Sequence, residues 1–448
     1  MQIRTIVDLV GVAVLIWSVV ASPALAQTLS PGAPPHEHPA PAPGEAAPAQ
    51  HEHHVAAATL FPTREASGTA WLPDATPMYG AHHQARGWDV MLHGNAFLQL
   101  LHEAAPEHRG ATQAGSINWL MAMARRPLGR GTFGLRTMFS LEPWTIRGCG
   151  YPNLLATGEV CDGDTIHDRQ HPHDFFMELA AELDRPVSGT LRWHLYGGLA
   201  GEPALGPPGF PHRISAMPNP LSPIAHHWLD ATHITFGLIT SGLYTQRWKV
   251  EGSVFNGREP DEQRYDLDLG RLDSVAARAW FLPTDSVALQ VSAGHLTDAE
   301  SEHAVEPAID VDRATASATY HRRFGAGHLW ATTLAWGANR EEGETTHGLV
   351  LESSLGWSGR HVWFGRAELN GKPAHDLHIH ESDDVFTVGK LQAGYTHYLP
   401  ARGGWTPGLG ATVSAALVPK ALQPRYGGVG TGVGIFLTLR PAAHEMTR

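Results

Sequence analysis

Apolar and polar residues alternate in short segments along most of the chain between Trp88 and Arg440. Successive side chains of a β-strand point to opposite faces, so this period of two predicts strands with one apolar and one polar face. In the first segment one face carries Trp88, Val90, Leu92, Gly94, Ala96, Leu98 and Leu100, and the other carries Asp89, Met91, His93, Asn95, Phe97 and Gln99. We delimit sixteen segments, at 88–101, 113–126, 131–145, 173–185, 190–201, 229–241, 245–257, 270–282, 285–297, 311–323, 328–339, 347–357, 361–370, 385–398, 405–418 and 430–440.

The connections between these segments alternate in length. The odd-numbered ones are mostly long, such as Cys149 to His171 and Glu202 to His227, whereas the even-numbered ones are tight turns, such as residues 185–189 and 358–360. After the N-terminal apolar run from Leu9 to Ala21, no stretch approaches the roughly 20 apolar residues that a membrane-spanning helix needs. A closed β-barrel is the other structure that can cross a bilayer, and bacterial barrels show this asymmetry of turns.

Charged residues on the polar faces separate a barrel from a soluble β-sandwich. A sandwich would bury these faces in a dry core, where unpaired charges are costly, whereas a watery lumen accommodates them. We therefore predict an all-β fold: a transmembrane antiparallel β-barrel of about 16 strands (14–18), with tight turns and both termini on the periplasmic side. The predicted lumen-lining charges are Glu142, Glu178, Glu182, Arg192, Lys249, Glu251, Arg278, Arg313, Arg366 and Glu368.

On this pattern, residues 88–440 resemble a Gram-negative outer-membrane β-barrel of porin size. The resemblance implies a location in the bacterial outer membrane and a channel for small polar solutes or ions. It also implies contact with membrane lipid, lipopolysaccharide and the barrel-assembly machinery. The chain departs from such barrels at its end, because it continues past Arg440 as PAAHEMTR instead of ending on an aromatic residue.

The residues before the barrel divide into three parts. Residues 1–26 predict a secretory signal peptide, since Arg4 precedes an apolar run and Ala24-Leu25-Ala26 forms a cleavage site. Residues 27–70 are rich in Pro, Ala and His and predict a disordered periplasmic arm. Residues 71–87 carry aromatic anchors and predict a segment at the mouth of the barrel or a plug in its lumen. At the other end, residues 441–448 form a tail.

Composition narrows the range of partners. The net charge is −12, from 44 acidic and 32 basic residues, so we do not expect nucleic acid as a partner. Cys149 and Cys161 lie 12 positions apart in one loop and predict a disulfide outside the reducing cytosol, with a metal–thiolate pair as the alternative. The 29 histidines are unusual, because they almost equal the Lys and Arg total of 32.

Histidine is a common metal ligand, and imidazole suits Cu(II), Ni(II) and Zn(II). Copper or zinc are therefore the possible cofactors, and a solvated, pH-sensitive arm with hydrogen-bonded rim residues is the alternative. A His-rich arm before a barrel also resembles the outer-membrane copper-resistance B proteins, although their arms are Met-rich and this arm contains no Met. The candidate ligands are His36, His38, His51, His53 and His54 in the arm, and His167, His171, His173, Asp174, His226, His227, Asp230, His375, His378 and His380 in the long loops.

Three functions remain open from the sequence. The first is a porin-like channel, with selectivity set by the inward charges. The second is a metal-handling outer-membrane protein that binds or exports copper or zinc. The third is an outer-membrane hydrolase with a rim site formed by Asp168, Asp174, His171 and Asp230; the chain has no G-x-S-x-G or H-E-x-x-H motif. We expect no enzymatic activity.

Overall fold

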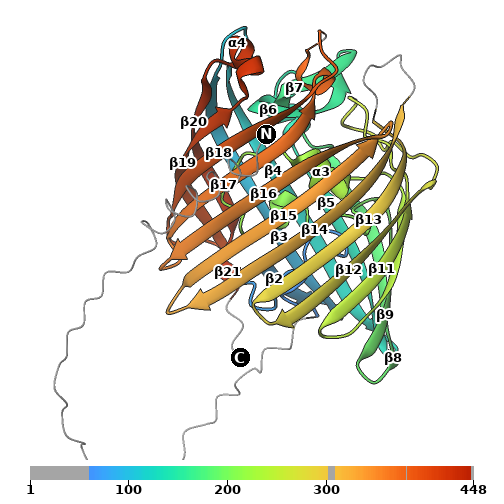
Figure 1. Cartoon of the computed structure of the whole chain (residues 1–448). Helices are drawn as coiled ribbons and strands as arrows, with labels where there is room; N and C mark the ends of the chain where they lie inside the picture. The colour runs from blue at the N-terminus through green and yellow to red at the C-terminus, as the bar shows by residue number, and fades with distance from the viewer. Residues whose placement is uncertain (1–59, 301–307, 380, 445–448) are drawn as a thin grey trace, which may run out of the picture. The chain divides into compact units, whose positions relative to one another are not determined.

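In the computed structural model, sixteen long antiparallel strands pair edge to edge into a closed barrel (Figure 1). The structure describes residues 60–300, 308–379 and 381–444. The strands are β3 (Trp88–Ala104), β4 (Ala111–Leu128), β5 (Gly131–Phe139), β8 (Phe176–Ser188), β9 (Leu191–Ala200), β10 (Leu238–Tyr244), β11 (Trp248–Phe255), β12 (Ser274–Thr284), β13 (Val287–Glu300), β14 (Ile309–Phe324), β15 (His328–Glu341), β16 (Glu344–Trp357), β17 (His361–Pro373), β18 (Val385–Tyr398), β19 (Trp405–Leu417) and β20 (Val429–Pro441). The predicted fold class and strand number are confirmed.

The last strand closes the barrel against the first. β20 pairs with the upper part of β3, from Thr431 opposite Ala104 to Leu439 opposite Ala96. The first residues of β3, 88–92, instead pair along the same edge with β2 (Ala81–Ala85), with which they form a hairpin. A two-residue pair between β1 (Met78–Tyr79) and β21 (Ala443–His444) lies outside the barrel sheet.

Turn chemistry explains the two unequal ends of the barrel. At one end the connections are short, such as residues 189–190, where Gly189 adopts a positive φ of 54° that L-residues avoid. At the other end most connections are long, and the longest ones carry secondary structure of their own. The predicted alternation of connection lengths is therefore present in the structure.

Two predicted strand boundaries differ from the structure by more than four residues. Segment 131–145 ends as a strand at Phe139, because a short helix, α2 (Glu142–Thr145), follows it with Pro143 in its first turn. Segment 229–241 becomes a strand only at Leu238, because its first part forms α3 (His226–Leu229) and the 3₁₀ turn η2 (Ala231–His233). Glu142 is consequently not a strand residue on the lumen wall. It is buried in α2, where its carboxylate accepts hydrogen bonds from the backbone N–H groups of Asn118 and His173.

The sequence pattern also did not predict the hairpin inside the second long loop. β6 (Tyr151–Cys161) and β7 (Asp164–Gln170) pair with each other and with no barrel strand. The predicted disulfide between Cys149 and Cys161 is present, with the two Cα atoms 5.8 Å apart, and it ties the start of this hairpin to its tip.

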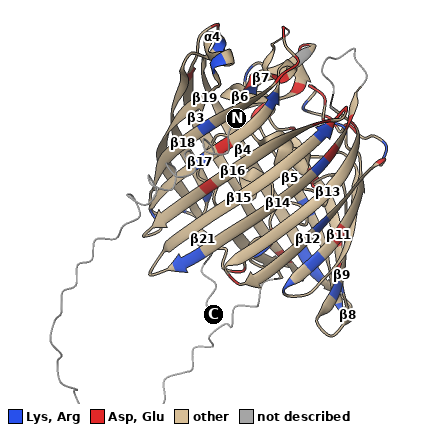
Figure 2. Ribbon diagram, viewed as in Figure 1, with Lys and Arg blue, Asp and Glu red and all other residues tan. Residues whose placement is uncertain are grey.

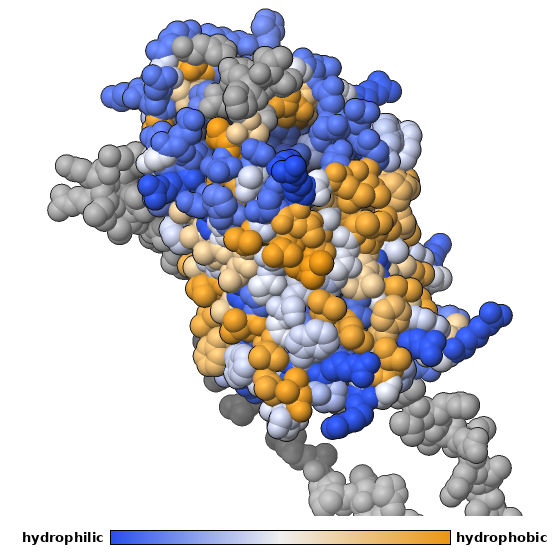
Figure 3. Space-filling model, turned by 90° about the vertical axis from the view of Figure 1, so that its right-hand side faces the viewer, coloured by the Kyte–Doolittle hydropathy of each residue, from blue (hydrophilic) through white to orange (hydrophobic). Residues whose placement is uncertain are grey.

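The outward faces of the strands are apolar, as the alternation predicts. Leu98 and Ile435 are each 60% exposed, whereas their inward neighbours Phe97 and Phe436 are buried. Figure 3 shows apolar side chains gathered on the wall of the barrel, and hydrophilic ones toward the end that carries the long loops. Most strand residues are uncharged (Figure 2). Among the described residues, no α-helix combines the length and apolar character needed to cross a membrane.

Replacing an outward side chain near the middle of a strand tests this arrangement. Leu98 lies in the middle of β3, so Leu98→Arg places a charge in hydrocarbon and should destabilise the folded barrel by about 2–4 kcal/mol. Urea unfolding in lipid vesicles, followed by tryptophan fluorescence, measures the change. Leu98→Ala is the control, and an equal loss in both variants would contradict the assignment of this face to lipid.

Candidate functional site

The connection between β9 and β10, residues 201–237, folds into the lumen. Of its residues all are buried except Met217, Ala231 and Gly237, which are partly exposed. Prolines at seven of the positions from 203 to 223 fix φ and remove backbone donors, so this stretch can form neither a strand nor a long helix. It instead makes tight turns and the short elements η1 (Phe210–His212), α3 and η2. We call residues 201–237 the lumen loop.

Arg213 anchors the lumen loop to the wall. Its Nε donates to Glu352 of β16 at 2.6 Å, and its Nη1 donates to Asp230 at 2.5 Å. All three side chains are only 1% exposed. Arg366 of β17 also reaches Glu352, at 3.3 Å, and donates to the carbonyl of Leu221 at 2.8 Å. The buried charges on this part of the wall are therefore neutralised by charges and carbonyls of the loop.

The lumen loop also contacts other parts of the wall. On one side the carboxylate of Glu368 accepts from the backbone N–H of Ala225, and Trp228 donates to Thr346. On other strands, Asn95 of β3 donates to the carbonyl of Met217, and Arg278 of β12 donates to the carbonyl of Gly206. Since strands far apart around the barrel all bind the loop, it spans the lumen.

The N-terminal residues 60–76 occupy the lumen at the short-turn end. The backbone N–H of Leu60 donates to Asp89 at 2.7 Å, and Arg125 pairs with Glu65 at 2.7 Å. Lys249 donates to the carbonyl of Thr69 and lies 4.6 Å from the ring centre of Trp71. We call residues 60–76 the N-terminal segment. It includes residues 60–70, which the sequence analysis grouped with the arm, and the first part of the predicted mouth or plug segment.

The two segments that fill the lumen contact each other directly. Ser67 accepts a hydrogen bond from the backbone N–H of Gly209 at 2.8 Å. Gly68 adopts a positive φ of 50°, and a Cβ at this position would lie 2.7 Å from the Cβ of Glu202. Glycine is therefore required at position 68 both by conformation and by the close approach of the two segments.

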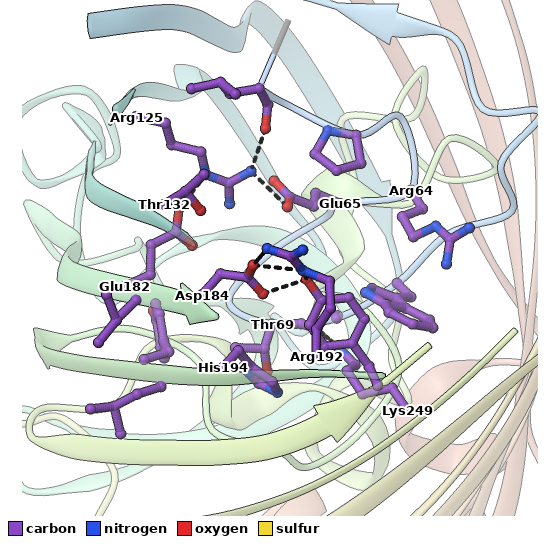
Figure 4. Close-up of a pocket in the computed structure, with 18 of the residues that line it drawn as sticks. Arg64, Glu65, Thr69, Arg125, Thr132, Glu182, Asp184, Arg192, His194 and Lys249 are labelled. Carbon is purple, nitrogen blue, oxygen red and sulfur yellow. Dashed lines mark hydrogen bonds and ion pairs between the residues drawn. The ribbon is translucent and has the colours of Figure 1, made fainter. Parts of the chain in front are cut away.

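A cavity of about 530 Å³ remains between the N-terminal segment and strands β4, β5, β8, β9, β10 and β11 (Figure 4). Its lining includes five basic side chains, Arg64, Arg125, Arg136, Arg192 and Lys249, and three acidic ones, Glu65, Glu182 and Asp184. Arg192 donates to Asp184 from Nε at 2.7 Å, and Arg125 contacts both Glu65 and Glu182. The cavity is thus charged and wettable, with a surplus of positive charge.

The structure places the predicted lumen charges as follows. Glu178, Glu182, Arg192, Lys249, Glu251, Arg278, Arg313, Arg366 and Glu368 all lie on barrel strands. Most belong to ion pairs, such as Arg278 with both Glu202 and Glu251, and Arg136 with Glu178. Arg313 donates to Asn339 at 2.8 Å.

Several of the predicted rim histidines come together where the lumen loop meets the second long loop. The ring centre of His226 lies 5.5 Å from that of His227 and 6.4 Å from that of His171. The ring centres of His173 and His233 are 5.3 Å apart. In each of three rings Nδ1 lies within hydrogen-bond distance of a fixed acceptor. These are Glu142 for His173, Asp230 for His226 and the carbonyl of residue 230 for His233.

Burial sets the protonation of this cluster. It lowers the pKa of His171 and His233 well below the usual range, and it lowers the pKa of His226 against the opposing charge of Asp230. Burial also raises the pKa of Asp174 to about 6 and that of Glu159 to about 8, although Arg264 opposes both shifts. Near pH 7 the rings of His171, His226 and His233 are therefore neutral, whereas Glu142 raises the pKa of His173 against the effect of burial.

The other predicted site residues lie apart from this histidine cluster. The tilted rings of His167 and His378 have their centres 4.1 Å apart, and His375 lies beside Asp376 in the 3₁₀ turn η3 (His375–Leu377). Asp168 pairs with Arg109 at 2.7 Å, so it is engaged in holding the loop. His36, His38, His51, His53, His54 and His380 lie outside the described residues.

Two groups of described residues bring three candidate ligand atoms close enough to share one ion without rearrangement. They are Cys149, Cys161 and Asp162, in which both thiols form the disulfide, and the loop carboxylates Asp261, Asp266 and Asp268. The predicted histidine ligands do not form such a group in the described part of the chain, so copper or zinc binding at the rim stays a prediction.

Sequence reasoning missed Arg213 and His212 in the lumen loop. A signal was present, because residues 201–237 contain only three charged side chains, Glu202, Arg213 and Asp230, among many apolar ones. A solvated loop of this length would carry more charge. The composition was therefore that of a buried segment.

Comparison with known proteins adds structural similarity only. No family model and no curated protein matches the chain. Among solved structures it is similar to OmpF of Salmonella typhi in a complex with daunomycin, with 9% identity, a TM-score of 0.49, and coverage of 80% of this chain and 100% of that one. It is also similar to an anion-selective porin from Comamonas acidovorans (14%, 0.45, 79% and 99%) and to the outer membrane channel DcaP of Acinetobacter baumannii (7%, 0.45, 80% and 99%). The resemblance to copper-resistance B proteins finds no support among these matches.

Removing the Arg213 side chain tests its role as an anchor. Arg213→Gln deprives buried Asp230 of its arginine and leaves buried Glu352 with Arg366 as its cation, which should weaken docking of the lumen loop by about 3–5 kcal/mol. Hydrogen exchange of residues 201–237 should rise accordingly. The matched control is Arg247→Gln, whose pair with Asp285 is half exposed or more and should contribute no more than about 1 kcal/mol.

Glu202 predicts a pH dependence of docking. Burial raises the pKa of this carboxyl to about 7 from the ordinary 4.5, although Arg278 opposes the shift. A raised carboxyl pKa stabilises the docked state fully below pH 4.5, and this contribution is lost as the pH rises through 7. Protection of residues 201–210 from hydrogen exchange, corrected for intrinsic rates, should therefore fall by about 2–3 kcal/mol more in the native protein than in Glu202→Gln between pH 4.5 and 9. Parallel profiles in the two proteins would contradict it.

Proposed function

We propose that this protein is an outer-membrane channel for small polar solutes, and that its passage is controlled by two segments of its own chain. The observation that carries the proposal is the nature of the lumen. The wall of a closed barrel carries charged and hydroxyl side chains strand after strand, and these side chains bind the material that fills it, beside apolar contacts such as those of Phe61 and Trp71. Polar contacts can be exchanged for water at much lower cost than an apolar core can be opened.

The filled lumen implies that solute passage requires movement. The lumen loop spans the middle of the barrel, and the N-terminal segment occupies its short-turn end. Both are attached to the wall by side chains that could bind water or ions when the segments leave. Opening therefore exposes a charged pathway that suits polar solutes and disfavours apolar ones.

The orientation completes this proposal. Short turns face the periplasm in bacterial barrels, so the N-terminal segment would close the periplasmic mouth and the His-rich loops would lie at the outer rim. This placement makes lipid and lipopolysaccharide the surroundings of the barrel, and the assembly machinery its transient partner. The proposal assigns no catalytic role to the rim Asp and His residues.

Conductance in planar lipid bilayers tests the channel. We expect small or infrequent openings from the native protein, because both segments are docked. Replacing the buried anchors of the N-terminal segment, in Phe61→Ser/Trp71→Ser, should increase conductance or open time, and Arg213→Gln should do so independently. Leu98→Ala on the outer face is the control and should leave both unchanged.

Swelling of proteoliposomes in sugars and amino acids then identifies the solute class. The absence of conductance from the native protein and from both loosened variants, at every voltage and with the fold verified by circular dichroism, would overturn the proposal.

A further inference from the structure

One histidine and two methionines lie side by side on three neighbouring strands, on the inward face of the barrel. The strand register places His93 of β3 directly opposite Met121 of β4, and Met121 directly opposite Met138 of β5. Directly opposed side chains on one face of an antiparallel pair have Cβ atoms about 4.5–5.5 Å apart. The three side chains are therefore neighbours because of the backbone pairing itself.

The lumen loop adds a fourth side chain to this row. The ring of His212 lies 5.7 Å from the ring of His93, centre to centre, and 4.4 Å from that of Trp119, to which it is tilted. His212 is 5% exposed, and its Nε2 has no hydrogen-bond partner in the described structure. A buried polar atom without a partner costs about 1–3 kcal/mol, which a bound ligand would recover.

The sulfur atoms of this region are buried and concentrated. The chain has nine methionines, and five of them, Met91, Met121, Met123, Met138 and Met177, belong to one buried cluster on β3, β4, β5 and β8. Met121 and Met138 are 0% and 2% exposed. His93 Nε2 lies 2.9 Å from the sulfur of Met121, so a ring nitrogen and a thioether already face each other.

Apolar packing is the simpler explanation of the methionines, since they also contact Phe61 and Phe236. It accounts for their burial, because methionine fills irregular spaces in a core. It does not account for the buried His212 Nε2, which has no hydrogen-bond partner in the described structure, on a ring only 5.7 Å from that of His93. Thioether sulfur is a soft donor that selects Cu(I), and imidazole nitrogen also binds copper.

We propose that His93, His212, Met121 and Met138 form a binding site for a soft monovalent cation, Cu(I) or its analogue Ag(I). All four ligands are uncharged, which suits a single positive charge better than a divalent ion in a buried place. The ion would replace the contact between the His93 nitrogen and the Met121 sulfur and would give His212 Nε2 a partner. Burial lowers the pKa of His212 well below its usual range, so its imidazole is neutral and able to bind.

The site does not depend on the proposed channel activity. Its ligands come from the wall and from the lumen loop, so a bound ion would link the two and favour the docked loop. Conductance and ion binding are measured separately, and failure of one leaves the other intact.

Metal titration of the full mature chain in detergent, without oxygen, tests the site. We expect one equivalent of Cu(I) to compete with a chromophoric chelator, and X-ray absorption to show sulfur as well as nitrogen around the copper. Ag(I), which is not oxidised in air, should bind with the same stoichiometry in calorimetry.

Variants separate this site from histidines elsewhere in the chain. Met121→Leu/Met138→Leu conserves volume, so the barrel should fold, and Cu(I) affinity should fall on the order of 10–100-fold or more with loss of the sulfur signal. Met217→Leu, a methionine of a different packing cluster, is the matched control and should bind like the native protein. If the double variant does not fold, Met121→Leu alone serves the same comparison.

Two results would overturn the proposal. One is native-like Cu(I) affinity in the variant, which would mean that the methionines only pack. The other is copper bound by nitrogen alone in the native protein, which would place it on histidines outside the row.

Discussion

A barrel whose lumen is filled by its own chain must neutralise the charges of its wall without water. The ion pair between Arg213 and Glu352 is the clearest answer to this constraint, because the loop brings a cation to a wall carboxylate and carries Asp230 as its own counter-charge. Arg366, Glu368 and Arg278 find partners in the same loop. The position of the lumen loop follows from where these charges are satisfied.

The architecture could be predicted from the sequence because two independent patterns identify a barrel strand. Alternation places Leu98 outward and Phe97 inward, and turn residues such as Gly189 mark where each strand ends. Both patterns are local, so a single sequence was enough to delimit sixteen segments. Errors occurred where apolar and polar residues continue to alternate outside the hydrogen-bonded strand, as at residues 229–237. Local alternation does not reveal that the backbone leaves the sheet there.

The interior of the barrel was less predictable, since it depends on contacts between residues far apart in the chain. The sequence showed that His171 and His226 lie in different long loops, and their closeness follows only from how both loops fold over the mouth. The role of Arg213, the single Arg or Lys of the lumen loop, follows only from its partner on β16. The row of His93, Met121 and Met138 needed the strand register, which no count of alternating residues supplies.

The hairpin of β2 and β3 has a consequence for the order of assembly. Because β2 occupies the lower edge of β3, the N-terminal segment enters the lumen from a strand that is already part of the sheet. The lumen loop is likewise tethered at both ends, by β9 and β10, on the same growing sheet. Neither segment has to thread a finished ring, since both can lie on the concave face before β20 meets β3. The two segments can therefore pack against the sheet first, and the pairing of β20 with β3 can close the barrel around them last.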